Sequence, residues 1–152
     1  MQLLGLLRRS APARIVNVAS AGQHALDFDN IMLENNYAGQ RAYRQSKLAQ
    51  IMFTFDLAGM LKNSEITVNA LHPATYMDTK LVRNSGVAPI STVREGAEAV
   101  EYLAFSQELE GVTGKYFNGK KQAHAHEQAY DEDVRQRLWD LSEELTGIET
   151  GE

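Results

Sequence analysis

The sequence predicts an α/β fold, a partial Rossmann-like doubly wound parallel sheet of about three strands with flanking helices. Short β-rich segments alternate with longer helical segments along the chain, which is typical of parallel strands joined by helical crossovers. Two long polar stretches, 23–40 and 74–91, are expected to be loops, and loops of that length are often functional. No repeat or linker divides the chain, so we expect a single domain over residues 1–152. The expected strands are 14–19, 66–71 and 115–118.

Four helical segments separate and flank these strands. Residues 2–9 carry leucines followed by two arginines, which suits the end of a helix. Residues 41–62 carry two apolar stripes, and a helix that is apolar on two sides needs two packing partners. The first stripe consists of Leu48, Ile51, Met52 and Phe55, and the second of Phe53, Leu57 and Leu61. We expect one stripe to face the sheet and the other to face a second subunit. Thr92 and Glu95 form a capping-box pattern that opens the third helix, and apolar residues at helical spacing between 130 and 145 mark the last one.

The composition limits the classes of function. A chain with 43% apolar and 23% charged residues is typical of a soluble globular domain, and a net charge of −5 disfavours nucleic-acid binding, which needs a basic surface. The absence of cysteine excludes disulfides, thiolate metal sites and a cysteine nucleophile. No apolar run approaches the roughly 20 residues of a membrane span, and the first residues lack the order of a signal peptide. We therefore expect a cytoplasmic protein without a metal, a membrane span or a nucleic-acid partner.

The candidate chemistry lies at the ends of the expected strands. Tyr43 and Lys47 lie four residues apart in the long helix, so their side chains share one face. A phenol has a pKa of about 10, and a neighbouring ammonium stabilises the phenolate, which suits a general acid or base. The pair alone is weak evidence, because many surface pairs have this spacing. However, Ser20 follows the first strand, and His72 and Pro73 end the second. Ligands of open parallel sheets bind at the carboxyl ends of strands, so we expect these residues to meet there.

Three segments together resemble a known family. Residues 14–20, 42–49 and 68–73 resemble, in that order, the short-chain dehydrogenase/reductase family, and the long stretch between the serine and the tyrosine is similar to its retinol-dehydrogenase-like branch. The resemblance covers nearly the whole chain. It implies an enzyme that interconverts a carbonyl and an alcohol by hydride transfer, with NAD or NADP as the cofactor and a small apolar carbonyl or alcohol as the substrate.

The resemblance also implies catalytic roles for three residues. Tyr43 would exchange a proton with the substrate oxygen. Lys47 would hold the nicotinamide ribose and stabilise the Tyr43 phenolate. Ser20 would hydrogen-bond the substrate oxygen, where charge develops during hydride transfer.

Three further residues match positions beside the nicotinamide. These are Pro73, Ala74, which stands where the family has a glycine, and Thr79, which lies one residue later than the commonest spacing. The glycine-rich turn that would place the pyrophosphate on a helix N-terminus does not occur in this sequence. The residue that selects between NAD and NADP does not occur either. We therefore expect the chain to be the C-terminal catalytic half of the fold, with the N-terminal dinucleotide-binding half absent.

A second hypothesis comes from a different class of protein. Without the glycine-rich half, the chain could be a non-catalytic fragment or interaction module that associates through an exposed sheet edge. The strand at 14–19 would then present an unpaired apolar edge, which is a template for pairing with another chain. Both hypotheses predict a homo-oligomer rather than a monomer.

Overall fold

A four-stranded sheet forms the centre of the molecule. The structure is a computed structural model that describes residues 3–148; residues 1–2 and 149–152, and with them the start of the helix expected at 2–9, lie outside the described part. The strands follow one another in the order β1-β2-β3-β4. The first three are parallel and the last is antiparallel, so the predicted α/β class is confirmed. Their bounds are Ala13–Val18 (β1), Ile66–His72 (β2), Lys115–Asn118 (β3) and Lys121–Ala123 (β4).

The strand β4 is an addition to the expected three. It follows β3 through a tight turn in which Gly119 has a φ of 59°, a conformation that glycine adopts without steric cost. A two-residue hairpin loop with glycine at its first position is typical of a type II′ turn, and Gly119 and Lys120 form the loop between β3 and β4. The turn brings the chain back along β3, with Phe117 opposite Gln122.

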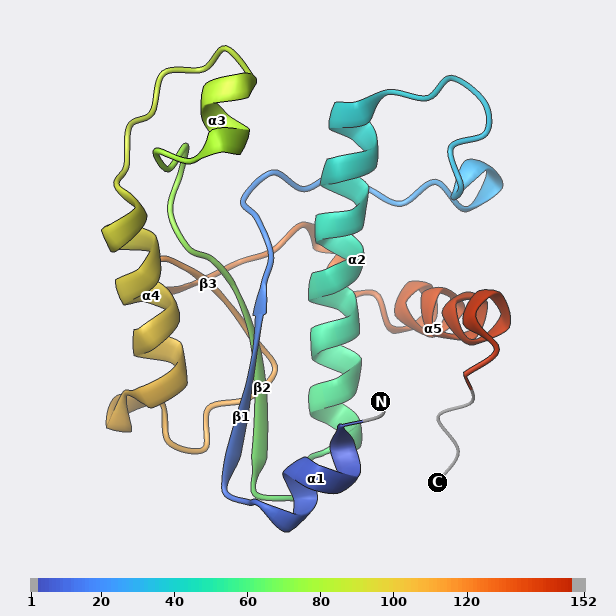
Figure 1. Cartoon of the computed structure of the whole chain (residues 1–152). Coiled ribbons are helices and arrows are strands. Elements are labelled where there is room, and N and C mark those ends of the chain that lie inside the picture. The colour runs from blue at the N-terminus through green and yellow to red at the C-terminus, as the bar shows by residue number, and fades with distance from the viewer. Residues whose placement is uncertain (1–2, 149–152) are drawn as a thin grey trace.

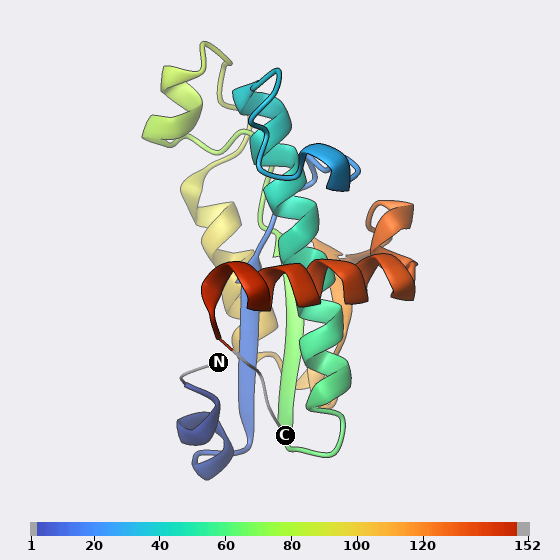
Figure 2. The same ribbon diagram turned by 90° about the vertical axis from the view of Figure 1, so that its right-hand side faces the viewer.

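Helices cover both faces of the sheet, as Figure 1 shows. One face carries α2 and α5, and the other carries α4. The short helices α1 and α3 lie at opposite ends of the strands, and Figure 2 shows α5 crossing α2 on its outer side. The bounds of the helices are Leu4–Arg9 (α1), Gly39–Met60 (α2), Lys80–Asn84 (α3), Val93–Phe105 (α4) and Glu132–Thr146 (α5), with single 3-10 turns at Phe28–Asn30 (η1), Gln107–Leu109 (η2) and Glu127–Tyr130 (η3).

The core has two layers because side chains alternate along the strands. On one side of β2, Ala70 packs in a cluster with Leu48 and Met52 of α2. On the other side, Leu71 packs with Leu103 of α4. Each fully buried side chain of this kind stabilises the fold by about 1.5–3 kcal/mol relative to an exposed one. The packing of Leu48 and Met52 holds α2 against the sheet and thereby fixes the position of its first turns relative to the ends of the strands.

The second apolar stripe of α2 meets partners within the same chain. Phe53, which is 37% exposed, stacks on Trp139 of α5 with ring centroids 5.4 Å apart and an interplanar angle of 5°. Leu57 and Leu61 are buried in a cluster that includes Leu4 of α1. The same cluster contains Ile66 and Val68 of β2, so the chain itself supplies packing partners for this stripe. The expectation that a second subunit also meets it stays a prediction.

The strand β1 is the edge of the sheet, since β2 is its only neighbour within residues 3–148. The strand contains one charged residue, Arg14, and its side chain does not cover that edge. Arg14 turns towards the end of α4, where its Nη1 donates to the carbonyl oxygens of Leu103 at 3.2 Å and Ser106 at 2.8 Å. The edge backbone is thus left without the charged side chain that commonly blocks strand pairing.

Candidate active site

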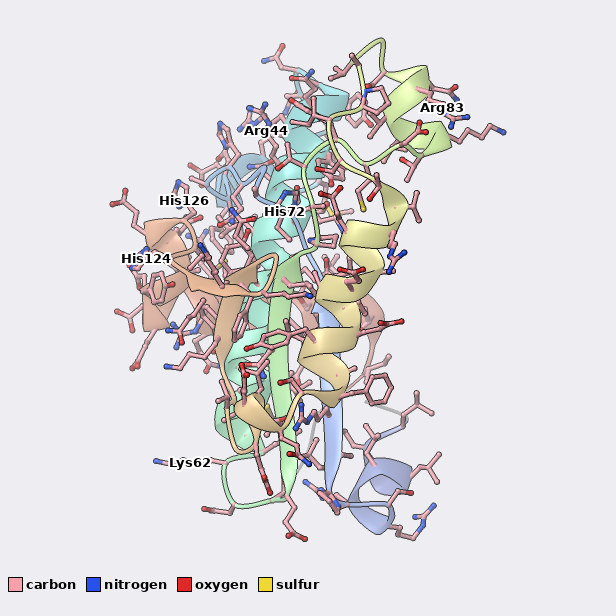
Figure 3. All side chains as sticks on the ribbon, turned by 90° about the vertical axis from the view of Figure 1, so that its left-hand side faces the viewer. Arg44, Lys62, His72, Arg83, His124 and His126 are labelled. Atoms are coloured by element: carbon pink, nitrogen blue, oxygen red, sulfur yellow. The ribbon has the colours of Figure 1, made fainter. Side chains whose placement is uncertain are left out.

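The carboxyl ends of β1 and β2 lie side by side. Val18 pairs with Leu71, and the Ala19 N–H donates to the Leu71 carbonyl oxygen at 2.8 Å. Ser20 and Pro73 therefore both leave the sheet at the carboxyl end of its strands, and both are buried. The N-terminal turns of α2 lie at this end too. Figure 3 shows Arg44 of α2 and His72 of β2 here, and Lys62 at the far end of the molecule.

Ser20 is held by hydrogen bonds on its backbone and its side chain. Its carbonyl oxygen accepts from the Tyr116 hydroxyl and from Gln23 Nε2, each at 3.1 Å. Its Oγ accepts from the Gly22 N–H at 3.0 Å, so its own hydroxyl proton remains free to donate. A Cβ placed on Gly22 would lie 3.5 Å from Ser20 Oγ and 3.9 Å from Tyr43 Cε1. The serine hydroxyl and the tyrosine ring thus border the same small space.

The predicted pair on α2 also meets at this edge. Lys47 Nζ donates to the Val18 carbonyl oxygen at 3.0 Å and to Gln50 Oε1 at 3.2 Å. The same nitrogen lies 5.8 Å from the centroid of the Tyr43 ring. Tyr43 is 45% exposed, and its hydroxyl makes no hydrogen bond with any residue of the described chain. The helix spacing that placed both side chains on one face thus brings an ammonium group and an accessible phenol beside Ser20.

The residues predicted beside a nicotinamide divide into two groups. Pro73 is buried and Ala74 is half-buried directly after β2, at the same edge as Ser20. Thr79 instead begins α3, where its Oγ1 accepts from the Val82 N–H at 3.4 Å. Its hydroxyl oxygen therefore serves as a helix cap, and its proton is still free to donate. Within the described residues, Thr79 makes no hydrogen bond to the other predicted site residues.

Two titratable groups near the strand ends are already engaged. Burial lowers the pKa of His72, whose Nε2 lies 2.9 Å from Thr75 Oγ1. This favours a neutral, structural imidazole. The pKa of Asp78 is also lowered, because Arg83 donates to both of its oxygens, at 2.6 Å and 2.8 Å. Both groups thus have polar partners within the chain.

The structure adds residues that the sequence pattern did not single out. Tyr116 fixes the Ser20 carbonyl from β3, and Gln50 binds Lys47 one turn along α2. Gly22 supplies the N–H that holds Ser20 Oγ. A signal for Gln50 existed, because residues three apart on a helix are neighbours. No local signal marked Tyr116, which lies 96 residues from Ser20 in the sequence.

The histidines near the C-terminal helix have partners within the described chain and form no metal site in it. Within residues 3–148, no group of three His, Asp or Glu side chains could hold a metal ion. The His124 ring packs on Tyr130 with centroids 4.2 Å apart, and His126 Nδ1 accepts from the Gln128 N–H at 3.2 Å. None of the helices in this range combines the length and apolar character that crossing a membrane requires.

Comparison with known proteins supports the resemblance seen in the sequence. No protein-family model matches the chain. Retinol dehydrogenase 14 of Homo sapiens is 40% identical over 96% of this chain and 48% of that protein. Retinol dehydrogenase 13 of Homo sapiens is 39% identical over 97% of this chain and 50% of that protein. The chain thus spans about half the length of the curated relatives it matches.

Solved structures with a similar fold point the same way. An uncharacterised protein from Mycobacterium paratuberculosis matches 91% of this chain and 52% of its own, with a TM-score of 0.68 and 24% identity. A short chain dehydrogenase from Pseudomonas syringae matches 77% of this chain and 44% of its own, with a TM-score of 0.57 and 23% identity. At these identities the likeness shows the fold alone. Taken with the sequence relatives, it confirms the resemblance: the chain belongs to the short-chain dehydrogenase/reductase family, in its retinol-dehydrogenase-like branch.

Proposed function

We propose that this chain carries the active-site part of an NAD(P)-dependent oxidoreductase that interconverts a carbonyl and an alcohol by hydride transfer. The observation that carries the proposal is the position of Lys47. Its ammonium bonds to the Val18 carbonyl oxygen at 3.0 Å, two residues before Ser20, and lies 5.8 Å from the Tyr43 ring centroid. A lysine held in this way lies near Ser20 in the chain fold and close enough to Tyr43 to stabilise its phenolate.

In the proposed mechanism the chain's own residues transfer one proton and stabilise the negative charge that its transfer involves. During reduction the Tyr43 hydroxyl donates its proton to the carbonyl oxygen of the substrate, and during oxidation the phenolate takes the proton back. The Ser20 hydroxyl donates a hydrogen bond to the same oxygen, where negative charge develops. The Lys47 ammonium stabilises the phenolate by its charge. Proton transfer by a positioned side chain of this kind contributes a factor of about 10²–10⁴ in rate.

The residues at the strand ends fit the nicotinamide end of a dinucleotide. When bound, such a cofactor supplies the hydride in reduction and accepts it in oxidation. An ammonium has three donor protons, and two of those on Lys47 are used within the chain, so the third is available for a ribose hydroxyl. Pro73 and Ala74 would border the nicotinamide ring, and the Thr79 hydroxyl proton would reach its carboxamide.

We further infer that residues 1–152 correspond to one domain, the C-terminal catalytic half of the family fold. The glycine-rich turn that would bind the pyrophosphate is not in these residues. The support is that the relatives are about twice as long as the chain. The substrate class we propose is a small apolar carbonyl or alcohol. Apolar side chains on the segment after β2 are exposed, among them Tyr76, Leu81 and Ile90.

A chimeric enzyme tests the proposal. The remaining half of human retinol dehydrogenase 14 is joined in front of this chain, and the reduction of retinaldehyde is measured with NADH and with NADPH. Tyr43→Phe keeps the ring and removes the proton, so kcat is expected to fall by a factor of about 10²–10⁴. Tyr102→Phe is the matched control, because its hydroxyl bonds to Glu108 at 2.8 Å on an exposed part of α4. A Tyr43→Phe chimera that turns over at the parent rate would contradict the assignment.

The unguarded edge of β1 supports a second candidate function, a module that associates through strand pairing. The two candidates differ in one measurable respect. Turnover that depends on Tyr43 is expected of the enzyme and not of an association module. A folded chimera that has no activity with either cofactor would favour the module.

A further inference from the structure

We propose that Gln50 is a positioning residue, which holds the Lys47 ammonium in the site as part of a closed connection between α2 and β1. The inference rests on the proposed function, because it assigns Gln50 a role through Lys47. It goes further because it identifies the side chain that keeps Lys47 in place, which the roles of Ser20, Tyr43 and Lys47 do not explain.

The first link is between Lys47 and its two acceptors. Gln50 lies three residues after Lys47, a spacing that makes the two side chains neighbours on α2. Gln50 Oε1 accepts from Lys47 Nζ at 3.2 Å, and the Val18 carbonyl oxygen accepts from the same nitrogen at 3.0 Å. A long lysine side chain loses much rotamer freedom when it is held. Two acceptors, one on the helix and one on the strand, therefore restrict where its third proton points.

The second link holds α2 itself against β1. Thr54, one turn further along α2, is fully buried. Its Oγ1 donates to the main-chain carbonyl oxygen of Gln50 at 2.8 Å and accepts from Asn17 Nδ2 at 2.9 Å. Asn17 directly precedes Val18 on β1. Neighbouring residues of β1 are thus bonded to helix positions about two turns apart, which opposes both sliding and rotation of α2 against the strand.

The chemistry of Gln50 suits this role. A neutral amide oxygen accepts a hydrogen bond from the ammonium and leaves its positive charge unpaired. A carboxylate at the same position would also accept the bond, but it would form an ion pair and reduce the field that Lys47 exerts on Tyr43. Gln50→Glu should therefore keep Lys47 in place, whereas Gln50→Leu should release it.

The test measures how readily each lysine amine reacts with acetic anhydride in the 152-residue chain without cofactor, followed by mass spectrometry. Lys62 is exposed at the far end of the molecule and is the internal reference. In Gln50→Leu, acetylation of Lys47 relative to Lys62 is expected to rise about fivefold, the factor that corresponds to one net hydrogen bond. Gln50→Glu should react no faster than the parent, because the carboxylate still accepts from Lys47 and its charge favours the protonated ammonium. Gln136→Leu is the matched control, because Gln136 donates to Asp140 on the surface of α5.

An unchanged Lys47 rate in a folded Gln50→Leu variant overturns the proposal. If that variant does not fold, NMR of the parent chain decides. A held side chain gives two separate Hε resonances for Lys47, assigned by their loss in Lys47→Arg, and a single averaged resonance overturns the proposal. Failure of the proposed function is distinguishable, because it would appear as turnover of the chimera that does not depend on Tyr43, with the acetylation result intact.

Discussion

Replacing Tyr116 with phenylalanine removes one of the two hydrogen bonds that hold the Ser20 carbonyl. The ring is 4% exposed, and phenylalanine fills the same space, so no cavity forms. The Ser20 oxygen keeps the bond from Gln23 Nε2 at 3.1 Å and is not left without a partner. The expected loss is therefore that of one net hydrogen bond, about 0.5–1.5 kcal/mol of unfolding free energy. For a chain of this size, a loss of 1 kcal/mol lowers Tm by about 2–4 °C.

Urea and thermal unfolding of the purified chain, followed by circular dichroism, measure this loss. Tyr102→Phe is the control, since its exposed hydroxyl bonds to Glu108 and surface changes are usually within about 0.5 kcal/mol. In the double variant Tyr116→Phe with Gln23→Leu, the Ser20 carbonyl loses both donors. The combined loss should then exceed the sum of the single losses, by about 0.5–3 kcal/mol. A Tyr116→Phe variant as stable as the parent, or additive losses in the double variant, would refute the shared role of these donors.

The same substitution has a signature in alkaline solution. Burial raises the pKa of Tyr116 above the ordinary value for tyrosine, so the phenol ionises first in the unfolded chain. Its contribution to stability is fully present below a pH of about 10 and is lost as the pH rises above it. Tyr116→Phe should therefore flatten the decline of unfolding free energy in this range, and an unchanged slope would contradict the burial argument.

Three further predictions concern the chain as a whole. Burial lowers the pKa of His72, so its stabilising contribution should be complete above a pH of about 6.5 and decline below it; His72→Gln should flatten the pH dependence of urea unfolding there, and an unchanged profile would reject this. Calorimetric titration with millimolar NADH or NADPH should show weak binding or none, because the glycine-rich turn is not in these residues, and a micromolar Kd would overturn that view. Sedimentation equilibrium at micromolar concentration should detect species larger than 16.9 kDa, because the β1 edge is unguarded; a single species at that mass would refute it.

Features that depend on neighbouring residues could be predicted from the sequence. The third strand was expected at 115–118 and lies there. The capping box of α4 forms as expected, with the Thr92 N–H donating to Glu95 Oε2 at 2.6 Å and the Glu95 N–H donating to Thr92 Oγ1 at 3.1 Å. The helix expected at 41–62 runs from Gly39 to Met60. These features depend on residues two to four positions apart, so the local sequence is enough to predict them.

Short elements inside expected loops were harder to predict. The segment 74–91, expected to be a loop, contains α3 over Lys80–Asn84. A helix of 5 residues shows too little periodicity to be recognised, and its start depends on the cap supplied by Thr79. The strand β4 is similarly short, with 3 residues, and its pairing with β3 decides it more than its own composition does.

The sequence by itself determined the α/β class, the positions of Ser20, Tyr43 and Lys47 at strand and helix ends, and the helical spacing that places Tyr43 and Lys47 on one face. Only the tertiary structure decided what holds them. The acceptor of the Lys47 ammonium on β1 is Val18, 29 residues away, and one of the two donors to the Ser20 carbonyl is Tyr116, 96 residues away. Such contacts form only when the core brings α2, β1 and β3 together, because hydrogen-bond partners distant in the chain leave no periodic trace in its sequence.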